Sequence, residues 1–230
     1  MTNKIILPTY SCKLPSNGKV VMYRPFTVME EKALLLALQE NDIDTIAIAI
    51  KNTIEICTNS EVDTTKVPYY DIEYLFMNIR SKSVGELIDL VGSCDCDPKA
   101  KTEFSININD IAVEPKPSGN FITKIADTDY TLIFTHPSLD DFIKTFKTEG
   151  SNATETVANC IVQVYTTDEV MDWSIKEKLE FVESMTSKQQ KDIAKFLADM
   201  PLVKLDASYK CRKCGKAHEQ VLSGFDNFFV

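Results

Sequence analysis

Four of the seven cysteines in the chain stand in two close pairs. Cys211 and Cys214 form a C-x-x-C pair that Gly215 follows, and Cys94 and Cys96 form a tighter C-D-C pair. Each pair lies at the end of one strand-like run and before another. Zinc ribbons are built in this way, from two turns that face each other across one tetrahedral ion. The sequence therefore predicts a structural zinc site that has these four thiolates as its ligands.

The short spacing of the first pair leaves two alternatives open. Side chains at positions i and i+2 of a strand point to opposite faces, so Cys94 and Cys96 need a tight turn to converge. In a mixed ligand set, Asp95, Asp97 or His218 would take the place of one thiolate. In the second alternative all the thiols are free and no metal is bound.

The remaining cysteines, Cys12, Cys57 and Cys160, show no partner pattern. Cys57 and Cys160 fall in apolar runs, which predicts small buried hydrophobic side chains. The odd cysteine count and an N-terminal apolar run of only three residues, Ile5 to Leu7, do not fit a secreted disulfide framework. We therefore expect a reducing cytosolic setting, in which the thiols are free or bound to metal.

Residue types that most catalytic sites use are scarce in this chain. It has only two histidines, His136 and His218, and it contains no G-x-S-x-G, P-loop, G-x-G-x-x-G or H-E-x-x-H motif. The C-x-x-C pair also lacks the strand-to-helix setting of a thioredoxin-like redox motif. We predict that the protein is not an enzyme and has no small-molecule substrate.

Composition and charge limit the classes of partner. The net charge of −9 disfavours nucleic acid, because binding to a phosphate backbone requires clustered lysine and arginine. No run approaches about 18 apolar residues, so no membrane-spanning helix is expected. The basic residues within 210–216, around the C-x-x-C pair, still leave one alternative open, a zinc-ribbon protein that binds nucleic acid.

Apolar periodicity predicts two helical parts, over residues 27–82 and 138–200. The first begins at a capping box formed by Thr27 and Glu30. The leucine-rich run that follows this box predicts a helix buried on several sides. In the second part, the segment ATETVANCIVQVYT, residues 153–166, is predicted as helix despite its β-branched residues.

Alternating apolar and polar residues predict a strand and ribbon part formed by residues 84–134 and 202–224. At the N-terminus, KIILP and KVVMYRP predict a hairpin around the turn SNG. In the centre, VGELIDLVGSCDC, KTEFSININDI and the FITKI–YTLIFT hairpin predict one small antiparallel sheet of about four strands. The predicted fold class is α+β, with helices flanking this sheet and a zinc-ribbon-like cysteine cluster, in a single domain over residues 1–230.

The last six residues contain three phenylalanines, Phe225, Phe228 and Phe229. This apolar tail has two interpretations: it packs on the core of its own chain, or it binds a partner protein. In the second case the three rings are the partner-binding residues.

Three segments in succession resemble one protein family. LPSNGKVVMYRPFTVMEEKALLLA resembles the N-terminal hairpin and first helix of the T-even-like myophage baseplate hub subunit and hub assembly protein family. TLIFTHPSLDDF resembles the step from hairpin to helix in those proteins. IAKFLADMPLVKLDASYKCRKCGKAHEQVLSGFDNFF shows the family's helix ending in M-P, a strand, C-x-x-C-G, a second strand and an aromatic finish. The resemblance covers most of the chain, and the succession of motifs is more specific than any one of them.

The resemblance implies a non-enzymatic role in building the central hub of a contractile-tail baseplate. Proteins of this family are hub assembly factors or minor hub components, and they act by binding other phage baseplate and hub proteins. The location implied is the host cytoplasm during assembly, and then the tail baseplate of the virion.

Overall fold

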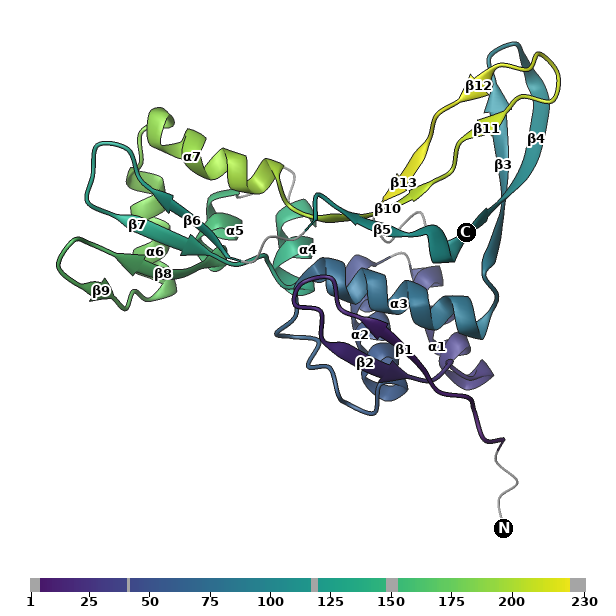
Figure 1. Cartoon of the computed structure of the whole chain (residues 1–230), viewed down its shortest axis with the longest axis horizontal. Helices are drawn as coiled ribbons and strands as arrows, with labels where there is room; N and C mark the ends of the chain where they lie inside the picture. Colours follow the sequence, from purple (N-terminus) through teal and green to yellow (C-terminus); the bar gives the residue numbers. More distant parts are fainter. Residues whose placement is uncertain (1–4, 41, 117–119, 148–152, 224–230) are drawn as a thin grey trace. The chain divides into compact units, whose positions relative to one another are not determined.

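The computed structural model of the chain describes residues 5–40, 42–116, 120–147 and 153–223. The chain folds into two compact units (Figure 1). The first unit comprises Met1–Thr64, Tyr70–Glu114 and Leu202–Val230, and the second comprises Thr65–Tyr69 and Pro115–Pro201. The prediction of a single domain over residues 1–230 stays a prediction.

The helical part of the first unit joins a hairpin to three helices. Its elements are β1 (Tyr10–Lys13), β2 (Val20–Tyr23), α1 (Val28–Glu40), α2 (Ile43–Cys57) and α3 (Tyr69–Ser83). The predicted first strand KIILP is wrong, because YSCK pairs with VVMY instead. Hydrogen bonds from Leu14 N to Lys19 O (2.9 Å) and from Gly18 N to Leu14 O (2.8 Å) close the turn directly after YSCK.

Helix α1 is much more exposed than its leucine content predicts. Leu34 and Ala37 are buried, whereas Leu35 is 52% exposed and Leu36 is 62% exposed. The prediction of a helix buried on several sides is therefore wrong, because only one face of α1 packs against the unit. The start of the helix is as expected: the main-chain N–H of Thr27 donates to the Glu30 carboxylate at 2.6 Å.

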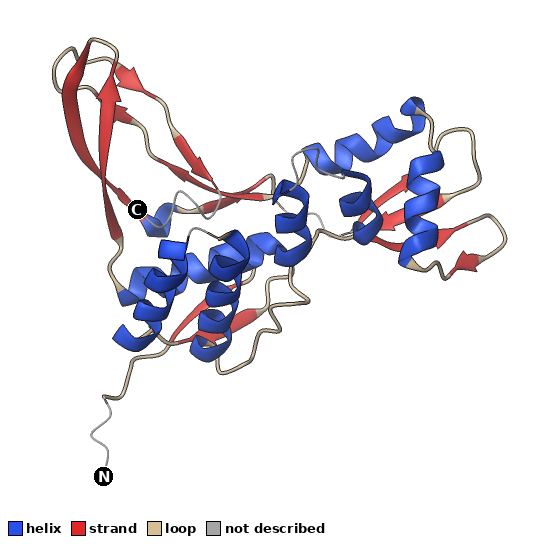
Figure 2. Ribbon diagram, turned by 180° about the vertical axis from the view of Figure 1, so that it is seen from behind, coloured by secondary structure: helices blue, strands red, loops and turns tan. Residues whose placement is uncertain are grey.

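The β part of the first unit consists of two hairpins and a three-stranded sheet. A long antiparallel hairpin pairs β3 (Leu87–Cys94) with β4 (Asp97–Asn107), and a short one pairs β11 (Tyr209–Lys210) with β12 (Ala217–His218). After β4, the 3-10 helix η1 (Ile108–Asp110) leads to the sheet. The sheet has the order β13 (Val221–Ser223), β10 (Leu202–Asp206), β5 (Ala112–Glu114). Figures 1 and 2 show the β11–β12 hairpin beside the far end of β3–β4.

The second unit is an antiparallel sheet with helices. Its strands run in the order β6 (Phe121–Lys124), β7 (Thr131–Phe134), β8 (Ile161–Tyr165), β9 (Val170–Met171). Its helices are α4 (Leu139–Lys147), α5 (Ala153–Cys160), α6 (Ile175–Ser184) and α7 (Ser187–Ala198). Side chains from the sheet and from α5, α6 and α7 form one buried apolar cluster, to which Phe134, Val164, Val182 and Phe196 belong.

The mixture of helices and antiparallel strands is confirmed, but the predicted arrangement is wrong in two places. The single central sheet does not form, because β3–β4 belongs to one unit and β6–β7 to the other. The helix predicted over 153–166 ends at Cys160, and Ile161–Tyr165 is strand β8. Its β-branched residues suit a strand, and pairing with β7 decides the conformation.

Candidate metal centre

A break in strand pairing brings the first two cysteines together. The β3–β4 register is regular as far as Ser93 and Lys101, and then it shifts so that Cys94 lies opposite Asp97. Asp95 and Cys96 form the tight turn that this pairing leaves. The C-D-C spacing therefore converges because the chain reverses between the two thiols, which removes the alternation expected of a continuous strand.

The second pair lies in a turn closed by its own main chain. The N–H of Cys211 donates to the carbonyl of Lys216, and the N–H of Gly215 donates to the carbonyl of Cys211, each at 2.9 Å. Gly215 has a φ of 74°, in the left-handed region that glycine enters without a steric cost. This explains the glycine that follows Cys214, because the turn can fold back only through that conformation.

The four sulfur atoms form a compact group. Cys94 Sγ lies 3.7 Å from Cys214 Sγ, and Cys96 Sγ lies 3.8 Å from Cys211 Sγ. All four sulfurs lie within 4.8 Å of one another. Four thiolates at about 2.3 Å from a tetrahedral zinc ion would be spaced by about 3.8 Å, so the donor set fits that ion. Residues up to 120 positions apart in the sequence thus meet in one cluster.

The two carboxylates of the alternative ligand set face lysines of the opposite turn. The Asp97 carboxylate accepts a hydrogen bond from Lys213 Nζ at 2.7 Å, and Asp95 lies 3.8 Å from Lys216 Nζ. His218 stacks on another ring, as described below. Among the described residues, the group that could hold a metal ion contains cysteines alone. The geometry thus favours four thiolates over a mixed ligand set.

The electrostatic environment differs between the two hairpins. Main-chain N–H groups of Cys214 and Lys213 point at the Cys211 sulfur and lower its pKa to about 6. Burial, together with the neighbouring thiols, raises the pKa of Cys96 to about 12. A thiolate thus forms more readily on Cys211 than on Cys96. Metal ligation requires deprotonated thiols, and a divalent cation would stabilise the charge that accumulates on four of them.

An aromatic stack next to the cluster joins the two hairpins. Tyr209 lies between Phe104 and His218, with ring centroids 4.8 Å from each. The Tyr209 ring also covers the main chain at Gly92, where an added Cβ would lie 2.2 Å from a ring carbon. This contact between Tyr209 and Gly92 was not predicted from the sequence. Gly92 could have predicted it, because a single glycine inside a strand often marks a place where another group comes close to the main chain.

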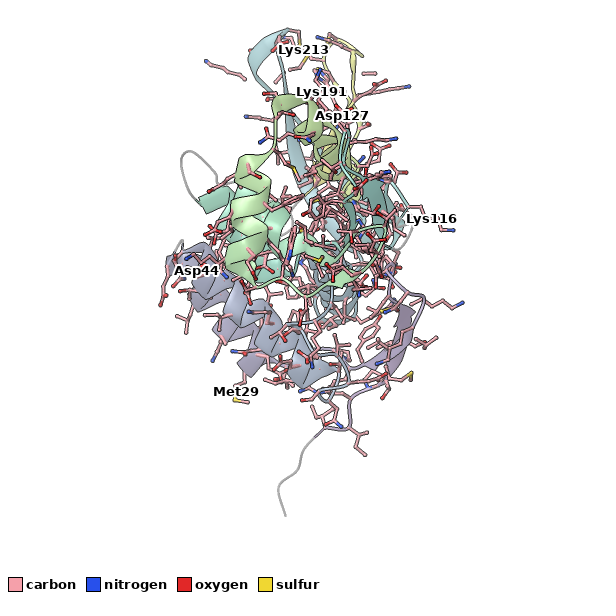
Figure 3. All side chains as sticks on the ribbon, turned by 90° about the vertical axis from the view of Figure 1, so that its left-hand side faces the viewer. Met29, Asp44, Lys116, Asp127, Lys191 and Lys213 are labelled. Atoms are coloured by element: carbon pink, nitrogen blue, oxygen red, sulfur yellow. The ribbon has the colours of Figure 1, made fainter. Side chains whose placement is uncertain are left out.

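The basic residues around the C-x-x-C pair are largely paired within the cluster region. Lys213 and Lys216 face the two aspartates of the opposite turn, and Arg212 Nη2 donates to the Glu103 carbonyl at 3.1 Å. Figure 3 shows Lys213 at the end of the hairpins. The charges at 210–216 thus mainly connect the two hairpins.

The whole chain resembles known phage proteins. A family model described as T4 bacteriophage base plate protein matches residues 7–230. The chain belongs to this family. A similar protein, the baseplate hub assembly protein gp26 of Enterobacteria phage T4, is 25% identical over 224 residues, which cover 96% of this chain and 97% of that protein. No solved structure matches the chain. The resemblance that the sequence motifs indicated is confirmed.

Cys57 and Cys160, in this member of the baseplate family, do not belong to the group of four cysteines. Cys57 and Cys160 are buried as predicted, and burial raises their pKa to about 11 and about 12. The partner-binding residues predicted in the tail, Phe225, Phe228 and Phe229, lie outside the described residues. None of the described helices is both long and apolar enough to cross a membrane.

Proposed function

We propose that the protein is a hub assembly factor or minor hub component of the phage baseplate, and that it acts by binding other baseplate proteins without catalysis. The observation that carries this proposal is the similarity, along nearly the whole chain, to a protein named for baseplate hub assembly. It acts in the host cytoplasm during assembly and then in the tail baseplate.

Co-expression with the hub proteins of the same phage tests this role. We expect a complex that survives size-exclusion chromatography, and a loss of complete hubs when the protein is left out. Normal hub assembly without the protein, together with no complex formed with any hub protein, would contradict the proposal.

We propose that Cys94, Cys96, Cys211 and Cys214 bind one structural zinc ion, as in a zinc ribbon. Support comes from the sulfur spacings of 3.7 and 3.8 Å and from the closed C-x-x-C turn. Four thiolates leave no open coordination position, so the ion would hold the two hairpins together and activate no water. The role is structural, which agrees with a protein that works by binding.

Metal analysis of the purified chain tests the ligand set. We expect about one zinc ion per chain, lost in Cys94→Ser, Cys96→Ser and Cys211→Ser. Cys12→Ser is the matched control, because Cys12 is a half-buried thiol outside the cluster. Full zinc retention in both Cys94→Ser and Cys96→Ser would show that the C-D-C pair is not part of the site.

Nothing in the structure favours the nucleic-acid alternative, because Arg212, Lys213 and Lys216 have partners within the hairpins. For the apolar tail we propose contact with a partner through Phe225, Phe228 and Phe229. Ending the chain at Ser223 should then weaken hub binding without changing the zinc content.

A further inference from the structure

The outer edge of β3 is a long strand edge that lacks a neighbouring strand. In the part of the chain that the structure describes, β3 pairs with β4 alone, so its other edge has no strand partner. β3 has eight residues, whereas the edge strands outside this hairpin have two to four. A free strand edge presents a row of main-chain N–H and C=O groups that can pair with another strand.

Two carbonyls show which main-chain groups of the hairpin point outward. The Ser93 carbonyl accepts a hydrogen bond from the Tyr209 hydroxyl, and the Glu103 carbonyl accepts one from Arg212 at 3.1 Å. Both donors lie outside the β3–β4 ladder. Successive antiparallel pairs alternate between hydrogen-bonded and non-hydrogen-bonded, and Val91, opposite Glu103, lies two positions before Ser93, so both pairs are of the second kind. By the same alternation, the outward-pointing main-chain groups of β3 also include those of Leu87, Asp89 and Val91.

These three residues offer both hydrogen bonds and apolar contact. Among the described residues, no group accepts a hydrogen bond from the outward N–H groups of Leu87, Asp89 and Val91. The side chains of Leu87 and Val91 are each more than half exposed, and they lie on the same face of the strand. An extended segment beside β3 would therefore satisfy main-chain groups and cover apolar surface together.

The opposite edge of the hairpin is protected in ways that β3 is not. β4 carries three charged side chains along its length, Lys99, Lys101 and Glu103. Arg212 already occupies the Glu103 carbonyl on that edge. Charged residues, lysine above all, keep strand edges from pairing with other chains. β3 has a single charged residue, Asp89, and neither lysine nor proline, so it is the edge of this hairpin that is open to another strand.

The charges favour a different protein, with a basic residue, as the partner of this edge. A hollow on this stretch of the hairpin is lined by two carboxylates, Asp89 and Glu103, and by one cation, Arg212. The guanidinium of Arg212 donates to a main-chain carbonyl, and neither carboxylate forms an ion pair among the described residues. A lysine or arginine next to Asp89 would complement this surface. Two copies of the chain, each with a net charge of −9, would instead repel each other.

We propose that the outer edge of β3 binds an extended segment of another baseplate protein as an added strand. This segment forms main-chain hydrogen bonds with Leu87, Asp89 and Val91. It carries apolar side chains two residues before and two residues after a lysine or arginine, which places them beside Leu87 and Val91 and the cation beside Asp89. The main-chain bonds supply affinity and the side chains supply specificity. The proposal rests on the proposed function, because it names the surface through which the protein would bind the hub.

Hydrogen exchange of the full-length chain, alone and with each hub protein of the same phage, tests the pairing directly. We expect the amides of Leu87, Asp89 and Val91 to exchange roughly tenfold or more slowly in the complex, because each then donates a hydrogen bond. The amide of Leu90 points into the hairpin and should be protected in both states. Contact through side chains alone would leave the three outward amides unchanged.

Variants on the two edges of the hairpin provide the matched comparison. Val91→Pro removes an outward N–H and spares the β3–β4 ladder, so we expect affinity for the hub protein to fall roughly tenfold or more. Glu103→Pro, directly opposite on β4, is the control and should bind like the unaltered chain. Val91→Lys keeps the N–H and adds a charge to the edge, so it should weaken binding even if the proline disturbs the hairpin. Asp89→Lys should weaken binding most at low salt.

Several outcomes would overturn the proposal. A complex in which Leu87, Asp89 and Val91 exchange as fast as in the isolated chain removes the β3 edge as the contact, while the hub role stands. A chain that binds no hub protein removes both. Protection of these amides that appears in the isolated chain as its concentration rises identifies a second copy as the occupant. Protection in the dilute isolated chain that is lost when the chain ends at Ser223 identifies the chain's own tail.

Discussion

The hairpin ends of the first unit and the core of the second unit are stabilised in different ways. In the second unit, three helices and a sheet enclose an apolar cluster in which Phe134 and Phe196 stack with ring centroids 5.0 Å apart. The hairpin ends of the first unit have no comparable core among the described residues: they are joined by four thiols, one aromatic stack, ion pairs and a few hydrogen bonds. Burial of apolar surface is spread over many residues, whereas a cross-link concentrates its contribution in a few. The hairpin ends should therefore depend on single residues far more than the second unit does.

Removal of the proposed zinc ion should give the largest difference in response between the two regions. With a zinc chelator, we expect hydrogen exchange in β11–β12 and in the adjoining ends of β3 and β4 to become fast, because the proposed ion supplies most of the local stabilisation. Fluorescence of Trp173, the only tryptophan, reports the second unit, where the ring contacts Tyr130 and Phe181. It should stay unchanged. A Trp173 response at the same chelator concentration would mean that the regions are not independent.

Truncation of an aromatic ring in the second unit should destabilise that unit and leave the hairpin ends unchanged. Phe134→Ala removes a fully buried side chain from the apolar cluster, and we expect a loss of about 3–5 kcal/mol in the unfolding free energy. Denaturation followed by Trp173 fluorescence measures this loss, while zinc content should not change. Ile122→Ala, at an exposed position of the same sheet, should cost less than about 0.5 kcal/mol. Zinc loss from Phe134→Ala under native conditions would contradict the separation.

One buried group in each unit should respond to pH in opposite directions. In the first unit, burial raises the pKa of Glu73 on α3 from 4.5 to about 8. Its neutral form is favoured in the folded state, so its stabilising contribution is complete below pH 4.5 and is lost as pH rises towards 8. In the second unit, burial lowers the pKa of His136. That contribution is present above pH 6.5 and is lost as pH falls.

The variant Glu73→Gln isolates the first of these effects. Each unit of pKa difference corresponds to about 1.4 kcal/mol, so at pH 8 the variant should gain on the order of a few kcal/mol over the unaltered chain. The gain should shrink as pH falls and disappear below pH 4.5, where Glu73 becomes neutral in both states. Hydrogen exchange of α3 amides at the two pH values measures it. A gain that does not change with pH would show that the Glu73 charge is not its cause.

Crowding at Gly92 should affect the hairpin ends alone. An alanine Cβ would overlap the Tyr209 ring, so we expect Gly92→Ala to cost about 1–3 kcal/mol through displacement of the aromatic stack. Faster hydrogen exchange in β11–β12 would report the displacement. Ser93→Ala, at the exposed neighbouring position, is the control. Combining Gly92→Ala with Tyr209→Ala should give less than the sum of the two losses, because both remove the same contact.

Features formed by residues close together in the sequence could be predicted, whereas the pairing of distant strands could not. Both cysteine pairs could be identified because the ligands of each pair lie within a few residues of one another, and the capping box of Thr27 and Glu30 is equally local. The grouping of strands into sheets was missed, since it depends on partners far away in the chain: β10 pairs with both β5 and β13. The exposed face of α1 was missed for the same reason. Leu34 and Leu35 are identical residues in the same run, and only packing against the rest of the unit buries one and leaves the other exposed.

The smallest expected effect concerns the ion pair between the hairpins. Lys213 and Asp97 lie 2.7 Å apart, but their side chains are 60% and 31% exposed, and solvent weakens such a pair. Lys213→Ala should therefore cost less than about 1 kcal/mol, and the difference should disappear at high salt, because screening removes what remains of the attraction. Zinc content should be unchanged. A loss of zinc from Lys213→Ala would show that the turn needs this pair to form, and the contrast between a few decisive thiols and many minor surface contacts would then fail.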